Sequence, residues 1–165
     1  MSNILTIENR KDEKFLREKT RVFDFDKFTR KEISGLIIRM RKAMHAAKGI
    51  GLSANQIGLN FKVFVAEIAT AKEGKKFYAI FNPKIEKTSS EKISFEEGCL
   101  SVPFTYGEVE RPEKIVLSGY DKNGKPLKIK AWGLLARVFQ HEMDHLNGML
   151  FVDRTKNVKR ITPDP

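Results

Sequence analysis

The two histidines at positions 141 and 145 are the residues of this chain whose types and spacing most directly suggest chemistry. Residues four apart lie on one face of an α-helix, so both imidazoles can reach the same point. Glu142 follows the first histidine, which puts a carboxylate beside that point without making it a ligand. Metal hydrolases place two ligands and a general base on one helix in this way. A helix with ordinary core or surface histidines is the alternative, because so short a motif also occurs by chance.

Cys99 is the single cysteine of the chain, and it follows a glycine within the segment 97–101. A thiolate here would complete a Cys–His–His set and leave a fourth tetrahedral position for water, which is the arrangement of a catalytic metal site. An inert buried cysteine and a nucleophile with a histidine base are the other roles open to this residue. The nucleophile role is less favoured, because it would leave Glu142 without a function.

Glycines and small residues fill the stretch from Gly49 to Gly58. They indicate backbone that passes close to another group. A phosphate-binding loop is excluded, because no Lys-Ser/Thr pair ends the stretch and the Gly-x-Gly-x-x-Gly spacing is absent. A tight helix-to-strand turn is one interpretation. The other is a strand that lines a site, with Gln56 as an amide donor facing it.

The length and composition predict one folded domain over residues 1–165, since the chain has 41% hydrophobic and 32% charged residues. No apolar run approaches the ~20 residues that span a bilayer. The N-terminus reaches charged residues before a signal-peptide core could form, and a lone cysteine suits a reducing compartment. We therefore expect a cytoplasmic protein without a membrane segment.

The formal net charge of +10 would attract an anionic partner. The basic residues are spread along the chain and no nucleic-acid motif accompanies them. A generally lysine-rich surface is therefore the favoured interpretation, and no sequence-specific nucleic-acid binding is expected. Weak association with the ribosome or with RNA is the alternative.

Two helices are predicted from apolar periodicity. Thr29-x-x-Glu32 forms a capping box before a helix at about Arg30–Lys48, and Gly49 would stop it. The second helix covers Gly133–Asn147 and ends before a glycine. The first should pack its apolar stripe against a sheet.

Runs of β-branched and aromatic residues between these helices predict strands. They are Lys62–Ile68, Phe77–Asn82 with Pro83 as its boundary, a short segment beginning at Ile85, Ile93–Phe95, Lys114–Tyr120 and Pro126–Lys130. An Asn-Gly pair separates the last two and is a strong hairpin signal. The order of helix, antiparallel strands and helix is typical of an α+β fold.

The three unusual stretches together resemble the peptide deformylase family. That family has Gly-x-Gly-Leu-Ala-Ala-x-Gln, Glu-Gly-Cys-Leu-Ser and Gln-His-Glu-x-Asp-His-Leu-x-Gly, in this order. Here the motifs stand at Gly49–Gln56, Glu97–Ser101 and Gln140–Gly148, with Ser53 where the family usually has alanine. The resemblance implies antiparallel β-sheets packed around a central C-terminal helix that carries His-Glu-x-x-His, with an N-terminal helix on the outside.

The resemblance also implies a metal and a substrate. Cys99, His141 and His145 would bind the ion, which in the family is usually Fe²⁺, with Ni²⁺, Co²⁺ or Zn²⁺ able to replace it. The substrate would be the N-formyl-methionyl end of a nascent peptide, and the products formate and a free amine. Glu142 would take a proton from the attacking water and later give it to the leaving amine.

The family motifs further suggest donors for the developing oxyanion, namely the Gln56 side-chain amide and the Leu100 backbone N–H. The methionine side chain needs an apolar slot, which we expect to be lined by Ile50, Gly51, Phe95, Leu134 and Val138. An ordinary core is the alternative for these lining residues. Arg137 stands where the family is commonly apolar, which bears on side-chain preference. Glu97 and Arg111 are expected to pair and to brace the Cys99 loop.

Two other function classes stay open from the sequence. A zinc peptidase would use His141-Glu142-x-x-His145, but the chain offers no further histidine downstream as a third ligand. A non-catalytic, basic ribosome- or RNA-binding protein would carry the motifs as relics. The intact ligands, Glu142 and Gln56 argue against decay. Metal content would separate the binding protein from both enzymes, and formate release would separate the enzymes from each other.

Overall fold

The computed structural model describes residues 4–72 and 74–162. Within them the helical elements are α1 (Arg10–Leu16), α2 (Arg30–Ala46), α3 (Gly133–Leu146) and the short 3-10 turns η1 (Phe25–Lys27), η2 (Ala54–Ile57) and η3 (Phe151–Asp153). The strands are β1 (Gly51–Ser53), β2 (Val63–Thr70), β3 (Gly74–Thr88), β4 (Lys92–Cys99), β5 (Val102–Pro112), β6 (Lys114–Tyr120), β7 (Pro126–Trp132) and β8 (Val158–Arg160). None of the helices in this described part combines the length and apolar character needed to cross a membrane.

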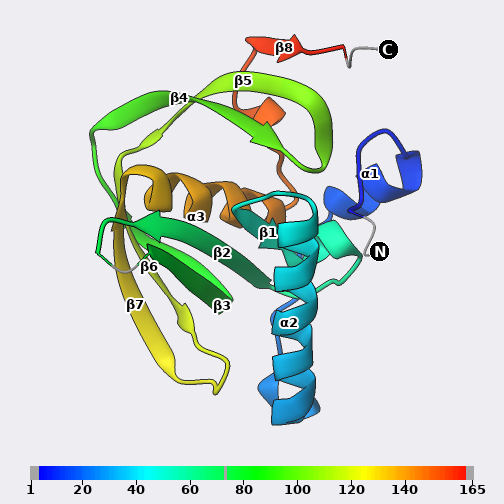
Figure 1. The fold of residues 1–165 in the computed structure, drawn as a ribbon, viewed down its shortest axis with the longest axis vertical. Helices are drawn as coiled ribbons and strands as arrows, with labels where there is room; N and C mark the ends of the chain where they lie inside the picture. Colours follow the sequence, from blue (N-terminus) through cyan, green and yellow to red (C-terminus); the bar gives the residue numbers. More distant parts are fainter. Residues whose placement is uncertain (1–3, 73, 163–165) are drawn as a thin grey trace.

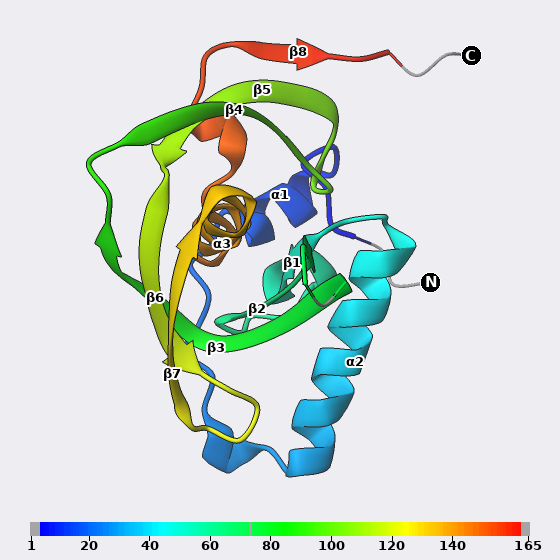
Figure 2. The same ribbon diagram turned by 60° about the vertical axis from the view of Figure 1, so that its left-hand side comes forward.

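Helix α3 lies between two antiparallel sheets (Figures 1 and 2). The larger sheet has the strand order β1-β2-β3-β6-β7, and the smaller has the order β4-β5-β8. Helix α2 lies on the outside, against β1 and β2 (Figure 1). The predicted α+β fold, with antiparallel sheets and a C-terminal helix, is therefore confirmed.

Both ends of α3 are set by glycines in the left-handed region, Gly133 with φ 58° and Gly148 with φ 75°. A side chain at Gly148 would overlap the backbone carbonyl of Arg17, so the chain needs a glycine here for two reasons. Both the backbone N–H and the hydroxyl of Thr20 donate to the Leu146 carbonyl, each at 2.9 Å. The N-terminal segment therefore crosses the last turn of α3 and satisfies one of its terminal carbonyls.

The capping box of α2 forms as predicted. Thr29 Oγ accepts from the Glu32 N–H at 3.2 Å, and a Glu32 carboxylate oxygen accepts from the Thr29 N–H at 2.7 Å. The helix ends at Ala46, two residues before the predicted end. Lys48, with φ 55°, takes the left-handed position after the helix in place of the predicted glycine stop. The apolar stripe of α2 packs against the larger sheet, as expected.

The predicted break at Pro83 is wrong, because β3 continues through it to Thr88. Asn82 adopts φ 48°, and the register to β6 shifts between Phe81 and Lys84. This bulge accommodates a proline that cannot donate to the ladder. The Asn82 amide side chain accepts from the Phe23 N–H at 2.7 Å and donates to the Phe23 carbonyl at 2.9 Å, which holds the bulge in place.

The helix α1, the strands β5 and β8 and the 3-10 turns η1, η2 and η3 were not predicted from the sequence. The side chain of Asn9 caps α1, accepting from the backbone N–H groups of Lys11 and Asp12. Strand β5 pairs with β4 along most of its length and places Arg111 opposite Ile93, from where its side chain contacts Glu97. The hairpin of β4 and β5 therefore forms the second wall around α3.

One cluster of the hydrophobic core lies between α3 and the larger sheet. Its fully buried aromatic rings, Phe139 on α3 and Phe64 on β2, have centroids 5.4 Å apart. Tyr78 on β3 contacts the same Phe139 ring edge-on at 5.3 Å. This packing fixes the rotation of α3, and so decides which of its residues face the smaller sheet.

Candidate active site

A cleft of about 490 Å³ opens between α3, β4 and the segment that leads into β1. Ten of the eleven residues expected at the site line it, and they are Ile50, Gly51, Gln56, Phe95, Cys99, Leu100, Leu134, Val138, His141 and Glu142. The eleventh, His145, is buried behind the cleft with 1% of its surface exposed. The fold therefore brings the three sequence motifs to one place.

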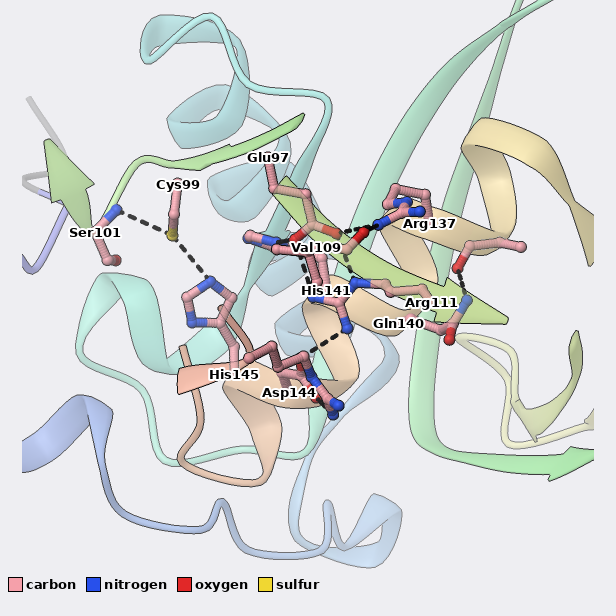
Figure 3. Close-up of polar contacts among 12 residues, drawn as sticks. Glu97, Cys99, Ser101, Val109, Arg111, Arg137, Gln140, His141, Asp144 and His145 are labelled. Atoms are coloured by element: carbon pink, nitrogen blue, oxygen red, sulfur yellow. Dashed lines mark hydrogen bonds and ion pairs between the residues drawn. The ribbon is translucent and has the colours of Figure 1, made fainter. Parts of the chain in front are cut away.

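The Cys99 sulfur and one ring nitrogen from each of His141 and His145 lie within 4.8 Å of one another. Cys99 ends β4, and the two histidines lie one turn apart on α3. The sulfur is 3.1 Å from His145 Nε2 and accepts from the Ser101 N–H at 3.4 Å (Figure 3). The spacing on the helix and the strand end thus produce the convergent donor group that the sequence predicted.

The electrostatics of this group favour the thiolate. Burial by itself would raise the pKa of the Cys99 thiol, but the neighbouring His145 and His141 imidazoles together lower it well below its usual range. The thiolate is the form of cysteine that binds metals.

Glu97 is the centre of a buried charged network beside the donor group (Figure 3). Arg111 donates to it from Nε at 2.6 Å and from Nη2 at 2.9 Å, which confirms the expected pair. His141 donates to the same carboxylate from Nδ1 at 2.9 Å, which leaves its Nε2 for the donor group. Burial would raise the pKa of Glu97, but the hydrogen bonds from Arg111 and His141 lower it far below its ordinary value. Glu97 therefore fixes both the tautomer and the ring orientation of His141.

Asp144 extends this network away from the cleft. Arg111 Nη1 donates to Asp144 at 2.8 Å, so one guanidinium joins two buried carboxylates. Arg154, from the segment after η3, donates to both oxygens of Asp144 at 2.5 Å. Asp144 therefore holds Arg111 in place and contributes no atom to the donor group.

Glu142 lies in the cleft beside β1. A side chain at Gly51 would overlap a carboxylate oxygen of Glu142, so the strand can approach this closely only with a glycine. Burial raises the pKa of Glu142 to about 7. Among the described residues, Glu142 Oε2 and His145 Nδ1 are the buried side-chain atoms without a hydrogen-bond partner. A carboxylate that is unpartnered and titrates near neutral pH can exchange a proton with a group in the cleft.

The Gln56 amide has a defined orientation. Its oxygen accepts from the Ser53 N–H at 3.0 Å and lies 3.1 Å from the Ser53 hydroxyl. Its Nε2 donates to the Ser101 hydroxyl at 3.1 Å and lies 3.8 Å from the Cys99 sulfur. The donor end of the amide therefore points toward the donor group, as expected for a residue that faces the site.

Asn55 joins this turn to α3. Its Nδ2 donates to the His145 carbonyl at 2.7 Å, and its oxygen lies 2.7 Å from the Ser53 hydroxyl. Both Asn55 and Ser53 are fully buried. Neither Asn55 nor Arg154 was singled out from the sequence. Asn55 lies inside the first motif, where a buried amide could have been expected, whereas no periodicity or motif marks Arg154.

The residues present fit a metal ion. One thiolate and two imidazoles converge, a glutamate braces one imidazole from behind, and an unpartnered carboxylate lies beside the group. Three protein donors with room for a further ligand is the arrangement of catalytic, as opposed to structural, transition-metal sites. Sulfur and imidazole donors suit ions such as iron, nickel and zinc, and not Mg²⁺ or Ca²⁺.

Comparison with known proteins gives one consistent result. A family model described as polypeptide deformylase matches residues 1–161. Peptide deformylase 2 of Gloeobacter violaceus is 43% identical over 132 residues, which cover 80% of this chain and 71% of the relative.

Solved structures agree with the sequence match. A probable peptide deformylase from Synechococcus phage S-SSM7 is 46% identical, with a TM-score of 0.84 over 94% of this chain and 100% of the other. A peptide deformylase from Synechococcus elongatus, in complex with actinonin, is 40% identical, with a TM-score of 0.81 over 93% of this chain and 78% of the other. The zinc peptidase and the non-catalytic RNA-binding protein are not favoured by these matches. In sequence along nearly its whole length, and in fold, the chain belongs to the polypeptide deformylase family of hydrolases.

Proposed function

We propose that residues 1–165 form one catalytic unit that removes the formyl group from N-terminal formyl-methionine of newly made proteins and releases formate. The observation that carries this proposal is the convergence of Cys99, His141 and His145 donor atoms within 4.8 Å, in a cleft that also contains Glu142 and Gln56. We propose Fe²⁺ as the resident ion, with Ni²⁺, Co²⁺ or Zn²⁺ as replacements. A mixed thiolate and imidazole donor set supports an ion of this class, and the preference for iron rests on the family resemblance.

A metal ion held by Cys99, His141 and His145 would act as a Lewis acid and make a water molecule nucleophilic near neutral pH. Glu97 keeps His141 in the orientation that this requires, because it accepts from Nδ1 at 2.9 Å. The tight hydrogen bonds from Arg111 hold Glu97 itself.

Glu142 is the proposed general base and acid. It takes a proton from the water as the oxygen attacks the formyl carbon, and it returns that proton to the amine nitrogen as the C–N bond breaks. Formate and a free α-amino group leave. A carboxylate whose burial raises its pKa to about 7 can both accept and donate a proton at neutral pH.

Gln56 and Leu100 are the proposed donors to the oxyanion that develops on the formyl oxygen. The Gln56 oxygen is held by Ser53, which turns Nε2 toward the Cys99 sulfur. The Leu100 backbone N–H belongs to the residue next to Cys99, which lines the same cleft. Donors fixed before the reaction stabilise developing charge without reorganisation.

The methionine side chain is proposed to enter an apolar slot beside Val138 and Gly51. Val138 is buried, whereas the lining residues Ile50, Phe95 and Leu134 are 47%, 60% and 52% exposed. An apolar side chain of the substrate would cover these surfaces on binding. We place this activity in the cytoplasm, with at most weak contact to the ribosome through the lysine-rich surface.

The test is formate release from a formyl-Met-Ala-Ser peptide. The protein is purified without oxygen and loaded separately with Fe²⁺, Ni²⁺ and Zn²⁺, and Glu142→Ala with bound metal serves as the control. We expect activity with Fe²⁺ or Ni²⁺ that falls by at least ~10²-fold in the control.

Formate release that is equal in the control would remove Glu142 from the mechanism. Bound metal without formate release under any loading would reject the proposed substrate.

A further inference from the structure

A second hollow, of about 270 Å³, lies next to the cleft. It is lined mainly by apolar side chains from β4 and from the start of α3. Phe95, Leu134 and Arg137 line both this hollow and the cleft. These three side chains are therefore the partition between the two.

The two hollows follow one seam between β4 and α3. Ile93, Phe95 and Glu97 alternate along β4 and so share a face. Glu97, beside His141, lines the cleft alone, Phe95 lines both hollows, and Ile93 lines the second hollow alone. The second hollow is therefore the continuation of the seam, past the partition and away from the donor group.

Arg137 is the fixed part of this partition (Figure 3). Its Nη1 donates to Glu97 at 2.9 Å and to the Val109 carbonyl at 2.6 Å, and its Nη2 donates to the Ile93 carbonyl at 2.6 Å. The side chain is 11% exposed, in contrast to the open Phe95 and Leu134. Because these hydrogen bonds fix the guanidinium, the methylene groups of Arg137 form an apolar surface in a fixed position.

We propose that Arg137 is the end wall of the slot for the first side chain of the substrate, and that it limits this side chain to the length of methionine. The proposal rests on the proposed deformylase function. The preferred substrates are then N-formyl peptides whose first side chain is apolar and no longer than that of methionine. A longer side chain must displace a guanidinium that donates three hydrogen bonds, although free space lies directly behind it.

The first measurement is a length series on the metal-loaded wild-type protein. Formyl peptides begin with methionine, norleucine, 2-aminoheptanoic acid or 2-aminooctanoic acid, and kcat/KM is read from formate release. We expect similar values for methionine and norleucine and a fall of ~10-fold or more for the longest residue. If kcat/KM of the wild type is the same for all four substrates, Arg137 is not an end wall and the proposal is wrong. Absence of activity even with methionine would instead reject the deformylase function itself.

The second measurement compares Arg137→Ala with Arg137→Met, with circular dichroism to verify folding. Both variants lose the charge, but only alanine opens the passage to the second hollow. In Arg137→Ala we expect the ratio of kcat/KM for the methionine peptide to that for the 2-aminooctanoic acid peptide to fall by ~10-fold. In Arg137→Met we expect this ratio to stay at the wild-type value. Equal profiles in the two variants would show that charge and not length is the cause, and would overturn the proposal. Arg137→Val replaces the alanine variant if that variant does not fold.

Discussion

Helix α3 packs against its two sheets with surfaces of opposite character. Toward the larger sheet it presents Phe139 and its apolar neighbours, which pack against Phe64 and Tyr78. Toward the smaller sheet it presents His141 and Asp144, which join a chain of buried ion pairs. Apolar packing stabilises without strict direction, whereas hydrogen-bonded ion pairs fix orientation and are costly when broken. One face of α3 therefore stabilises the fold, and the other fixes the geometry of the site.

The largest effect is expected from His145→Ala. Removing one of three donors should reduce bound metal well below ~1 ion per chain and bring formate release below detection. The same variant should also unfold at a lower temperature than the metal-loaded wild type, because bound metal stabilises the folded state. Elemental analysis and thermal unfolding provide the two readouts. Full metal occupancy in this variant would show that Cys99 and His141 suffice.

Arg111→Met should affect both stability and activity. Glu97 keeps Arg137 and His141, and Asp144 keeps Arg154, but both carboxylates lose the buried guanidinium that joins them. Breaking a buried pair costs about 3–5 kcal/mol. Activity per folded molecule should fall as well, since Glu97 would hold His141 less firmly. Denaturant unfolding and kcat/KM, corrected for the folded fraction, measure these effects. Arg154→Met is the matched control on the more exposed arm of the network, and a smaller loss is expected there.

Phe139→Ala tests the apolar face. The loss of a fully buried ring should cost about 3–5 kcal/mol of unfolding free energy. Activity per folded molecule should stay close to that of the wild type, because Phe139 packs against Phe64 and Tyr78 of the larger sheet and is not one of the residues that line the cleft. A fall in activity as large as that of Arg111→Met would mean that the two faces do not divide their tasks.

Ser53→Ala should have the smallest effect. The variant removes a hydroxyl 3.1 Å from the Gln56 oxygen and 2.7 Å from the Asn55 oxygen, while the Ser53 N–H continues to hold Gln56. A loss of about 0.5–1.5 kcal/mol in stability and a few-fold fall in kcat are expected. Unchanged KM alongside reduced kcat would place the effect on the orientation of Gln56. An unchanged kcat would show that the backbone bond is sufficient.

Sequence patterns predicted the elements whose cause is local. The capping box of α2 and strand β6 occur where periodicity and turn chemistry indicated them. Strand β5 was not predicted, because the hairpin that joins it to β4 is irregular: the register shifts between Gly98 and Cys99, and Phe104 takes an unusual positive φ of 56°. The passage of β3 through Pro83 depends on a bulge held by Phe23, which is distant in sequence.

The residues of the site, like the elements of the fold, could be predicted where their cause is local. Two ligand candidates share one helix, so their proximity follows from helix geometry alone. The placement of Cys99 beside them depends on the β4–β5 hairpin, and the family resemblance indicated it before the structure did. Arg154 could not be predicted, because only the tertiary fold brings it to Asp144.

The crossing of the N-terminal segment over the last turn of α3 has a consequence for the order of folding. Thr20 leaves the ribosome early, yet its hydrogen-bond acceptor, Leu146, lies 126 positions later in the chain. That turn carries His145, so the donor group can be completed only after synthesis has passed this turn. An enzyme proposed to act on the first residue of other nascent chains would therefore complete its own site only after its own synthesis has passed His145 and Leu146.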